Sequence, residues 1–170
     1  LLRLNEINQE KSVTDYLTGL CNRRGMEDYI HEKWPCWAQK EHYLICESID
    51  LDGLKYINDT YGHKEGDWAI CTVADAISRT LGEDGIAART GGDEFVIVLT
   101  GTDEQKILVI EQKIRESLEE KNRLSGKPYR AECSMGHYMT PISARESFEE
   151  CMRLSDIEMY KEKKAKKAGR

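Results

Sequence analysis

The stretch RTGGDEFVIVL, residues 89–99, decides how this chain folds. Gly91 and Gly92 predict the turn of a hairpin with positive φ, and the apolar run over residues 95–99 predicts a strand that enters a core. Asp93 and Glu94 lie between the turn and the strand, where two adjacent carboxylates repel each other as they lose water. The acidic residues are therefore stable here only with raised pKa values or with a compensating cation.

The remaining sequence alternates strand-like and helix-like patterns. Strands are predicted over residues 43–51, 86–89, 94–99 and 129–140, and helices over residues 22–33, 54–61, 68–81, 105–118 and 148–159. Pro35 is expected to lie beyond the end of the first of these helices. This order, with a hairpin in the middle, predicts an α/β or α+β fold in which helices pack on a sheet.

Length and composition predict one globular domain. The chain has 170 residues, of which 39% are apolar and 33% charged, enough to bury roughly 70% of the unfolded surface. No apolar run approaches the ~20 residues that span a bilayer. The six cysteines lack zinc-site spacing. Several of them fall within apolar periods, and we interpret these as small buried apolar residues, which fits a reducing cytoplasm.

The first residues have a helical pattern of their own. Leu1, Leu4 and Ile7 have helical spacing that stops near Ser12, which fits either the tail of a coiled coil or a bare capping segment. Because the sequence begins at Leu1 rather than Met, we expect a longer parent protein. Whether that parent has a membrane anchor stays an open question.

A second acidic pair precedes the hairpin. Asp50 and Asp52 are two residues apart at the end of a predicted strand, so they point to the same face. Each alone would fit a solvated loop or a helix cap. If the strands are neighbours, these carboxylates converge with Asp93 and Glu94, and no counter-charge is visible in the pattern. Oxygen ligands without His or Cys select Mg²⁺ or Mn²⁺, so a divalent metal is the predicted compensating charge.

A nucleotide could supply the remaining ligands of such a metal. No Gly-rich phosphate loop of a known type is present, so phosphates would meet the helix start at residues 53–55, with Lys163 and Lys167 adding charge. Asn58 and Asp67 can together read a guanine edge. Three alternatives stay open: Lys55 as a surface lysine, Asn58 as a helix stop, and Asp67 as an N-cap.

Taken together, these segments resemble the GGDEF-domain diguanylate cyclases. The similarity runs from residue 15 to about residue 167 with order and spacing kept. It rests on five motifs: DxLTGLxNRR at residues 15–24, DxDxxKxxNDxxGHxxGD at residues 50–67, RxGGDEF at residues 89–95, SxG at residues 134–136 and MYxxK at residues 159–163.

The resemblance implies a central five-stranded mixed sheet flanked by helices, related to the palm of nucleotidyl cyclases. It also implies condensation of two GTP into cyclic di-GMP and pyrophosphate by two-metal chemistry across a homodimer. Residues 15–170 would form the catalytic domain, and residues 1–14 a helical linker from an upstream sensory domain.

Carried over by position, the resemblance also assigns roles to residues. Asp50, the Leu51 carbonyl and Asp93 would bind Mg²⁺ or Mn²⁺, and Glu94 would lie beside them in the catalytic turn. GTP would be bound by eight residues: Leu54, Lys55, Asn58, Asp67, Gly91, Gly92, Lys163 and Lys167. Two of these depart from the family pattern, because Leu54 stands where Phe is frequent and Lys167 where Arg is common.

One regulatory motif of the family is missing. Many relatives have Arg-x-x-Asp at the offset where this chain has Gly82 and Gly85, so we expect no tight product inhibition there. The main rival function is a receptor domain that binds GTP or a protein partner without turnover. The basic end of the chain suggests a nucleic-acid binder more weakly, and we expect neither nucleic-acid nor membrane contact by this fragment.

Overall fold

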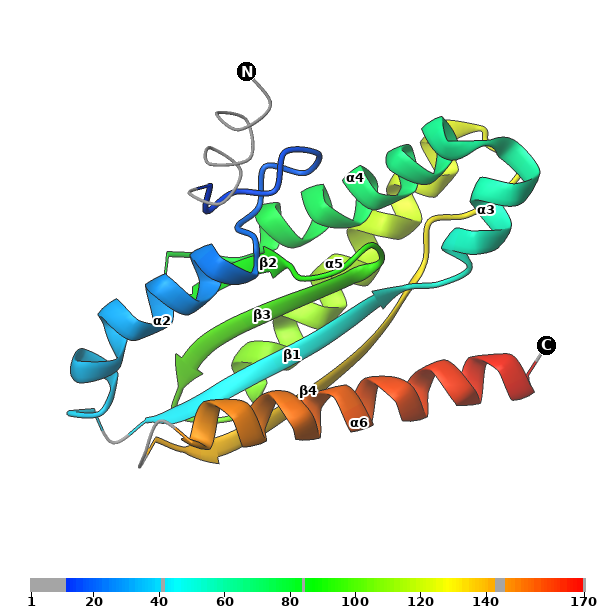
Figure 1. The fold of residues 1–170 in the computed structure, drawn as a ribbon. Helices are drawn as coiled ribbons and strands as arrows, with labels where there is room; N and C mark the ends of the chain where they lie inside the picture. Colours follow the sequence, from blue (N-terminus) through cyan, green and yellow to red (C-terminus); the bar gives the residue numbers. More distant parts are fainter. Residues whose placement is uncertain (1–11, 41, 84, 143–145, 170) are drawn as a thin grey trace, which may run out of the picture.

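The computed structural model describes residues 12–40, 42–83, 85–142 and 146–169 (Figure 1). The helix expected over Leu1, Leu4 and Ile7 lies outside these residues. At the end of the expected linker, Thr14 is extended and forms an isolated bridge with Cys21. Within the described ranges, no helix combines the length and the apolar character that crossing a bilayer requires.

Four strands form one sheet in the order β2-β3-β1-β4. They are β1 (Tyr43–Leu51), β2 (Gly85–Arg89), β3 (Glu94–Gly101) and β4 (Cys133–Pro141). Every neighbouring pair is antiparallel. Eight of the nine residues of β1 are buried, as the predicted central strand requires.

The expectation of a five-stranded mixed sheet is wrong for the described residues. The additional parallel contact at the outer edge of β2 is a single bridge from Cys21 to Ala88. Cys21 cannot extend this bridge into a strand, because Asn22 already caps the next helix by accepting a hydrogen bond from the Gly25 amide. The α/β class itself is confirmed.

Helices cover both faces of the sheet (Figure 1). The odd-numbered residues of β1, such as Ile45 and Ile49, pack with α4 (His63–Thr80) and α5 (Gln105–Ser125). The even-numbered Leu44 and Cys46 pack with residues of α2 (Arg23–Trp37) and α6 (Glu146–Ala168). The short helix α3 (Leu54–Tyr61) follows β1 directly and leads into α4.

Three predicted local features differ in the structure. Helix α2 runs two residues past Pro35, because a proline in the last turn removes only one helical hydrogen bond. Strand β4 begins at Cys133, since Tyr129 instead packs its ring at 4.9 Å from that of Tyr61. The hairpin loop has four residues, and its glycines are not among those with positive φ, so the predicted primed turn is wrong.

Helix α6 lies directly on β4 at Gly136. A Cβ atom on this glycine would overlap backbone atoms of Glu158 and Met159. Beside this contact, the hydroxyls of Ser48 and Ser155 are 2.8 Å apart in the interface between β1 and α6. Glycine is therefore required at residue 136 for the close approach that positions α6.

Replacing Gly136 with alanine should push α6 away from β4. Backbone atoms cannot move aside as a flexible side chain does, so we expect a loss of about 3 kcal/mol or more in the free energy of unfolding, at the upper end for overpacking. Gly82→Ala is the matched control, because nothing lies within 4 Å of a Cβ there. Urea denaturation measures both, and equal stability of the two variants would contradict the proposed contact.

Candidate functional site

The predicted acidic residues converge at one end of the sheet. Asp50 pairs with Glu94 across β1 and β3, and the Leu51 amide donates to the Asp93 carbonyl at 2.8 Å. On the other side of β1, the Asp52 amide donates to the Glu132 carbonyl at 2.8 Å. The end of β1 is thus fixed between the hairpin turn and the start of β4.

Two lysines of α6 compensate the acids of β1. Lys163 Nζ lies 2.6 Å from Asp50 Oδ1, and Lys166 Nζ lies 3.0 Å from Asp52 Oδ2. Asp52 also accepts from the Ser134 hydroxyl at 2.7 Å. The prediction that Asp50 and Asp52 share a face is confirmed, whereas the prediction that the cluster lacks an internal counter-charge is wrong.

Lys166 was missed by the sequence reasoning. Lys167, which was predicted to contact phosphates, is exposed, and its neighbour Lys166 reaches the acidic edge. The spacing of the residues could have indicated this contact. Lys163 and Lys166 are three residues apart and lie on one face of a helix, and Asp50 and Asp52 are two residues apart and lie on one face of a strand.

The site keeps an excess of negative charge despite these lysines. Burial raises the pKa of Asp50, the hydrogen bond from Lys163 opposes this rise, and the nearby charges of Asp93 and Asp52 add to it. Burial alone would lower the pKa of Lys163, but the hydrogen bond and charge of Asp50 outweigh it, so the net pKa is raised. The positive charge of Lys163 is therefore stabilised by the acids around it.

The donor set fits a hard divalent cation. Asp50 and Asp93 offer carboxylate oxygens and Leu51 a backbone carbonyl, which are the ligands that Mg²⁺ and Mn²⁺ prefer. Glu94 is exposed beside them. The residues present are therefore compatible with the predicted metal.

A partly buried ion pair fixes the hairpin turn. Arg89 Nη1 lies 3.2 Å from Asp15 Oδ1, with side chains 13% and 15% exposed, and Arg89 Nη2 donates to the Gly92 carbonyl at 2.9 Å. Partial burial would raise the pKa of Asp15, but hydrogen bonds from Thr18 and the charge of Arg89 outweigh it and lower the pKa. Arg89 thus ties the turn to the loop before α2.

The two glycines of the turn have different tasks. A Cβ on Gly91 would overlap the carboxylate of Glu94, so the glycine lets the exposed Glu94 side chain fold back over the turn. Nothing lies within 4 Å of a Cβ on Gly92, whose backbone carbonyl is the acceptor for Arg89. The Thr90 amide closes the loop by donating to the Glu94 carbonyl at 3.0 Å.

The start of α3 lies next to the acidic edge. Gly53 precedes this helix with φ of 70°, a conformation that favours glycine, and Leu54 packs partly against the core. Lys55 is largely exposed and pairs with Asp59 at 2.6 Å. Its predicted phosphate contact would therefore require it to leave Asp59.

Asn58 and Asp67 lie on adjacent helices. A Cβ on Gly66 would overlap the Asn58 side-chain oxygen, so glycine lets α4 approach this amide closely. Asp67 follows Gly66 and is exposed. The alternative of Asp67 as an N-cap is wrong, because α4 begins at His63.

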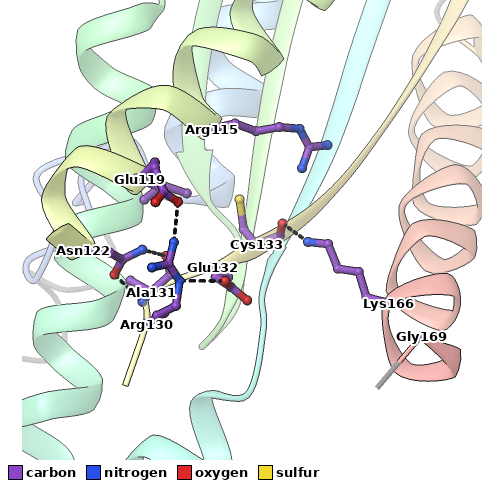
Figure 2. Close-up of a pocket in the computed structure, with 10 residues that line it drawn as sticks. Arg115, Glu119, Asn122, Arg130, Ala131, Glu132, Cys133, Lys166 and Gly169 are labelled. Carbon is purple, nitrogen blue, oxygen red and sulfur yellow. Dashed lines mark hydrogen bonds and ion pairs between the residues drawn. The ribbon is translucent and has the colours of Figure 1, made fainter. Parts of the chain in front are cut away.

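Two cavities border the site. One of about 210 Å³ lies behind the turn, where its lining includes Glu94, Arg23 and Asp156. Another of about 490 Å³ lies between α5, the residues leading into β4 and the end of α6 (Figure 2). Figure 2 shows Lys166 at its rim, where it donates to the Cys133 carbonyl at 2.6 Å, so one lysine contacts both this cavity and Asp52.

Comparisons with known proteins agree with this geometry. The family model described as diguanylate cyclase, GGDEF domain, matches residues 12–169. The chain is 30% identical over 163 residues to the probable diguanylate cyclase DgcC of Escherichia coli K12, covering 95% of this chain and 43% of DgcC. It is also 30% identical over 158 residues to the diguanylate cyclase DgcP of the same strain, covering 92% of this chain and 46% of DgcP. It therefore spans less than half the length of either relative.

Solved structures share the fold. The GGDEF domain of DgcB from Caulobacter crescentus, in complex with c-di-GMP, matches with a TM-score of 0.80 and 26% identity over 91% of this chain and 92% of that domain. A Pseudomonas aeruginosa protein, TpbB or YfiN, trimmed to its GGDEF domain matches with a TM-score of 0.77 and 28% identity over 89% of each chain. A family match over nearly the whole sequence, in this shared fold, means that the chain belongs to the GGDEF-domain family of diguanylate cyclases.

Proposed function

We propose that this chain is a diguanylate cyclase domain that condenses two GTP into cyclic di-GMP and pyrophosphate. The observation that carries the proposal is the convergence of Asp50, Asp93 and Lys163 at the sheet edge beside α3. These residues would offer oxygen ligands to a metal and a cation to phosphates. Membership of the cyclase family supports the same reaction.

Asp50, Asp93 and the Leu51 carbonyl would hold Mg²⁺ or Mn²⁺, with Glu94 beside them. When bound, two such ions lower the pKa of a ribose 3′-hydroxyl and neutralise charge on the phosphates. The other residues of the site would position the nucleotides, and such positioning contributes much of the rate of these reactions.

The residues around the metal ligands would bind the nucleotide. The backbone N–H groups at the start of α3, near Leu54 and Lys55, would meet the phosphates. Lys163 would exchange its contact with Asp50 for a phosphate oxygen, and Lys167 would contribute charge from the exposed side of α6. The Gly91-Gly92 turn would lie against the nucleotide, and Asn58 and Asp67 would bind guanine.

One copy of the site holds one GTP, so two copies must face each other for each 3′-oxygen to attack the other α-phosphate. A homodimer is therefore the proposed active form, and an upstream sensory domain would control its formation. We also propose a cytoplasmic location, which suits a GTP-consuming reaction and the free cysteines of the described residues. Nucleic acid has no part in this reaction.

The rival receptor function is disfavoured because Asp50 and the complete GGDEF motif at residues 91–95 are both present. Incubation with GTP and Mg²⁺, followed by chromatography of the products, distinguishes turnover from binding alone.

Asp93→Ala should abolish this turnover while the fold stays intact. The Asp93 backbone, not its side chain, makes the hydrogen bond to Leu51, so we expect an unchanged melting temperature and a loss of about a thousandfold in kcat. Glu120→Gln, an exposed change on α5, is the control that should keep full activity. Full activity of Asp93→Ala would remove Asp93 from the metal site.

Selection of guanine should depend on Asn58 and Asp67. Alanine at either residue should lower the ratio of kcat/KM for GTP over ATP by about tenfold, because a lost hydrogen bond in a binding site costs about 1–3 kcal/mol. Lys64→Ala, exposed in the same helix as Asp67, should leave the ratio unchanged. Comparable turnover of GTP and ATP by the unaltered protein would refute the assignment.

Arg89 should act as a positioning residue of the turn. Arg89→Gln would leave Asp15 and the Gly92 carbonyl without their cation, which should cost about 1–3 kcal/mol in the free energy of unfolding. Hydrogen exchange at the Thr90 and Gly91 amides should become faster, and kcat should fall. The control Arg79→Gln removes an exposed ion pair and should change neither the hydrogen exchange of these amides nor kcat. Unchanged hydrogen exchange in Arg89→Gln would contradict the positioning role of Arg89.

Tight product inhibition at residues 82–85 should be absent. Gly82 has no side chain to bind product, and a Cβ on Gly85 would lie within 3.0 Å of neighbouring atoms on Leu81, Val98 and Leu99. Asp84 lies outside the described residues, and Arg79 pairs with Asp75 at 3.0 Å. Calorimetry with cyclic di-GMP should therefore detect no micromolar binding here. Micromolar binding of two or more ligands per domain that disappears in Arg79→Ala would contradict this expectation.

A further inference from the structure

A buried carboxylate lies in the middle of the sheet. Glu47 is a residue of the central strand β1, its side chain is 0% exposed, and neither of its oxygens has a hydrogen-bond partner in the described part of the chain. An ionised carboxylate without a partner is strongly unfavourable in the interior of a protein. This side chain therefore calls for a compensating interaction.

The side chain of Glu47 points into a cluster of two other potential ligands. His137 is its cross-strand neighbour on β4, and Glu111 reaches the pair from α5. His137 Nδ1 is 3.8 Å from Glu47 Oε2 and 2.6 Å from Glu111 Oε1. One ligand atom from each of the three residues lies within 4.8 Å of the others.

The cluster is separate from the predicted catalytic site. Glu47 and Asp50 are three residues apart in one strand, so their side chains point to opposite faces of the sheet. Asp50 faces Lys163 of α6, whereas Glu47 faces Glu111 of α5. A ligand held by Glu47 would thus lie on the α5 side of the sheet.

The charges around the cluster favour a cation. Arg115 and a protonated His137 are the basic groups, and Arg115 is already 2.8 Å from Glu162. Against them stand the carboxylates of Glu47, Glu111, Glu104 and Glu162. A metal on Nδ1 would leave His137 neutral, so four carboxylates would face one guanidinium, and a divalent ion would offset two of the three surplus negative charges.

We propose that Glu47, Glu111 and His137 form a binding site for a divalent transition-metal ion, with Zn²⁺ as the best match. One imidazole nitrogen with two carboxylates suits Zn²⁺, whereas Mg²⁺ prefers oxygen ligands alone. The outer contact supports this choice, because His137 Nε2 lies 2.7 Å from Glu104 Oε1. Ligating histidines usually donate their second N–H to such an acceptor, which fixes the ring and the tautomer.

The required rearrangement is small. In a tetrahedral zinc site the ligand atoms are about 3.3 Å apart, so Glu111 and His137 would separate slightly and Glu47 would approach them. Water would complete the shell. The ion would join β1, β4 and α5 and give a partner to the unsatisfied carboxylate of Glu47, so its role would be structural and independent of GTP turnover.

Zinc binding to the whole 170-residue chain tests the proposal without nucleotide or Mg²⁺. Competition against a chromophoric chelator should give one Zn²⁺ per chain with a micromolar or lower Kd, and Zn²⁺ should raise the melting temperature. A Cys36→Ser background removes the exposed thiol from this measurement.

Variants locate the site. Glu47→Gln and His137→Gln should each weaken Zn²⁺ binding by about a hundredfold or more, and Glu104→Gln by about tenfold, because it changes only the outer contact. His31→Gln is the matched control, since His31 is exposed on α2 and should leave the Kd unchanged. Glu47→Leu should fold without metal and lose the zinc-dependent rise in melting temperature, which keeps the test decisive if a polar variant unfolds.

Cobalt substitution gives an independent readout. Co²⁺ in the unaltered chain should show the intense visible absorption of a low-symmetry nitrogen and oxygen site, and this absorption should be lost in Glu47→Leu. Failure of the chain to bind Zn²⁺, Zn²⁺ binding that is equal in His137→Gln and His31→Gln, or a cobalt spectrum like that of the aqueous ion would overturn the proposal. The cluster would then be a network of ion pairs in which Glu47 shares a proton with Glu111.

Discussion

The burial of Asp50 at the end of the central strand is the constraint on which the site depends. A carboxylate there loses water on folding, and the structure brings the lysines of α6 to this edge in response. That response requires α6 to lie against the sheet, which Gly136 permits by letting backbone meet backbone. The core, the helix position and the charge balance of the site are therefore linked.

Because side chains alternate along β1, the two faces of the sheet carry different kinds of residues. Even-numbered residues carry the acids that face α6, where the pKa of Asp50 is raised and a hard cation would be stabilised. Odd-numbered residues face α4 and α5 and are apolar except for Glu47. An isolated acid among apolar neighbours is unfavourable unless another element supplies its partner, and His137 and Glu111 lie close to Glu47 without hydrogen-bonding to it.

The loop of the hairpin between β2 and β3 is held in place by contacts from Arg89. This four-residue loop has few backbone hydrogen bonds of its own, and Arg89 adds contacts to Gly92 and to Asp15, 74 residues earlier in the chain. Asp15 and Arg89 were visible as motif residues, but no local pattern indicated that they form one ion pair. Their contacts hold the turn that carries Asp93 and Glu94.

The sequence by itself determined the α/β class, the bounds of β1 and α3, the shared face of Asp50 and Asp52, and the excess of acid at one sheet edge. These features follow from local periodicity, which is a property of neighbouring residues. Only the tertiary structure decided that Lys166 rather than Lys167 meets Asp52, that Cys21 forms a bridge and no fifth strand, and that Glu47 faces His137. Each of these depends on the register between elements that are distant in the chain, and register is set by packing, which local patterns do not encode.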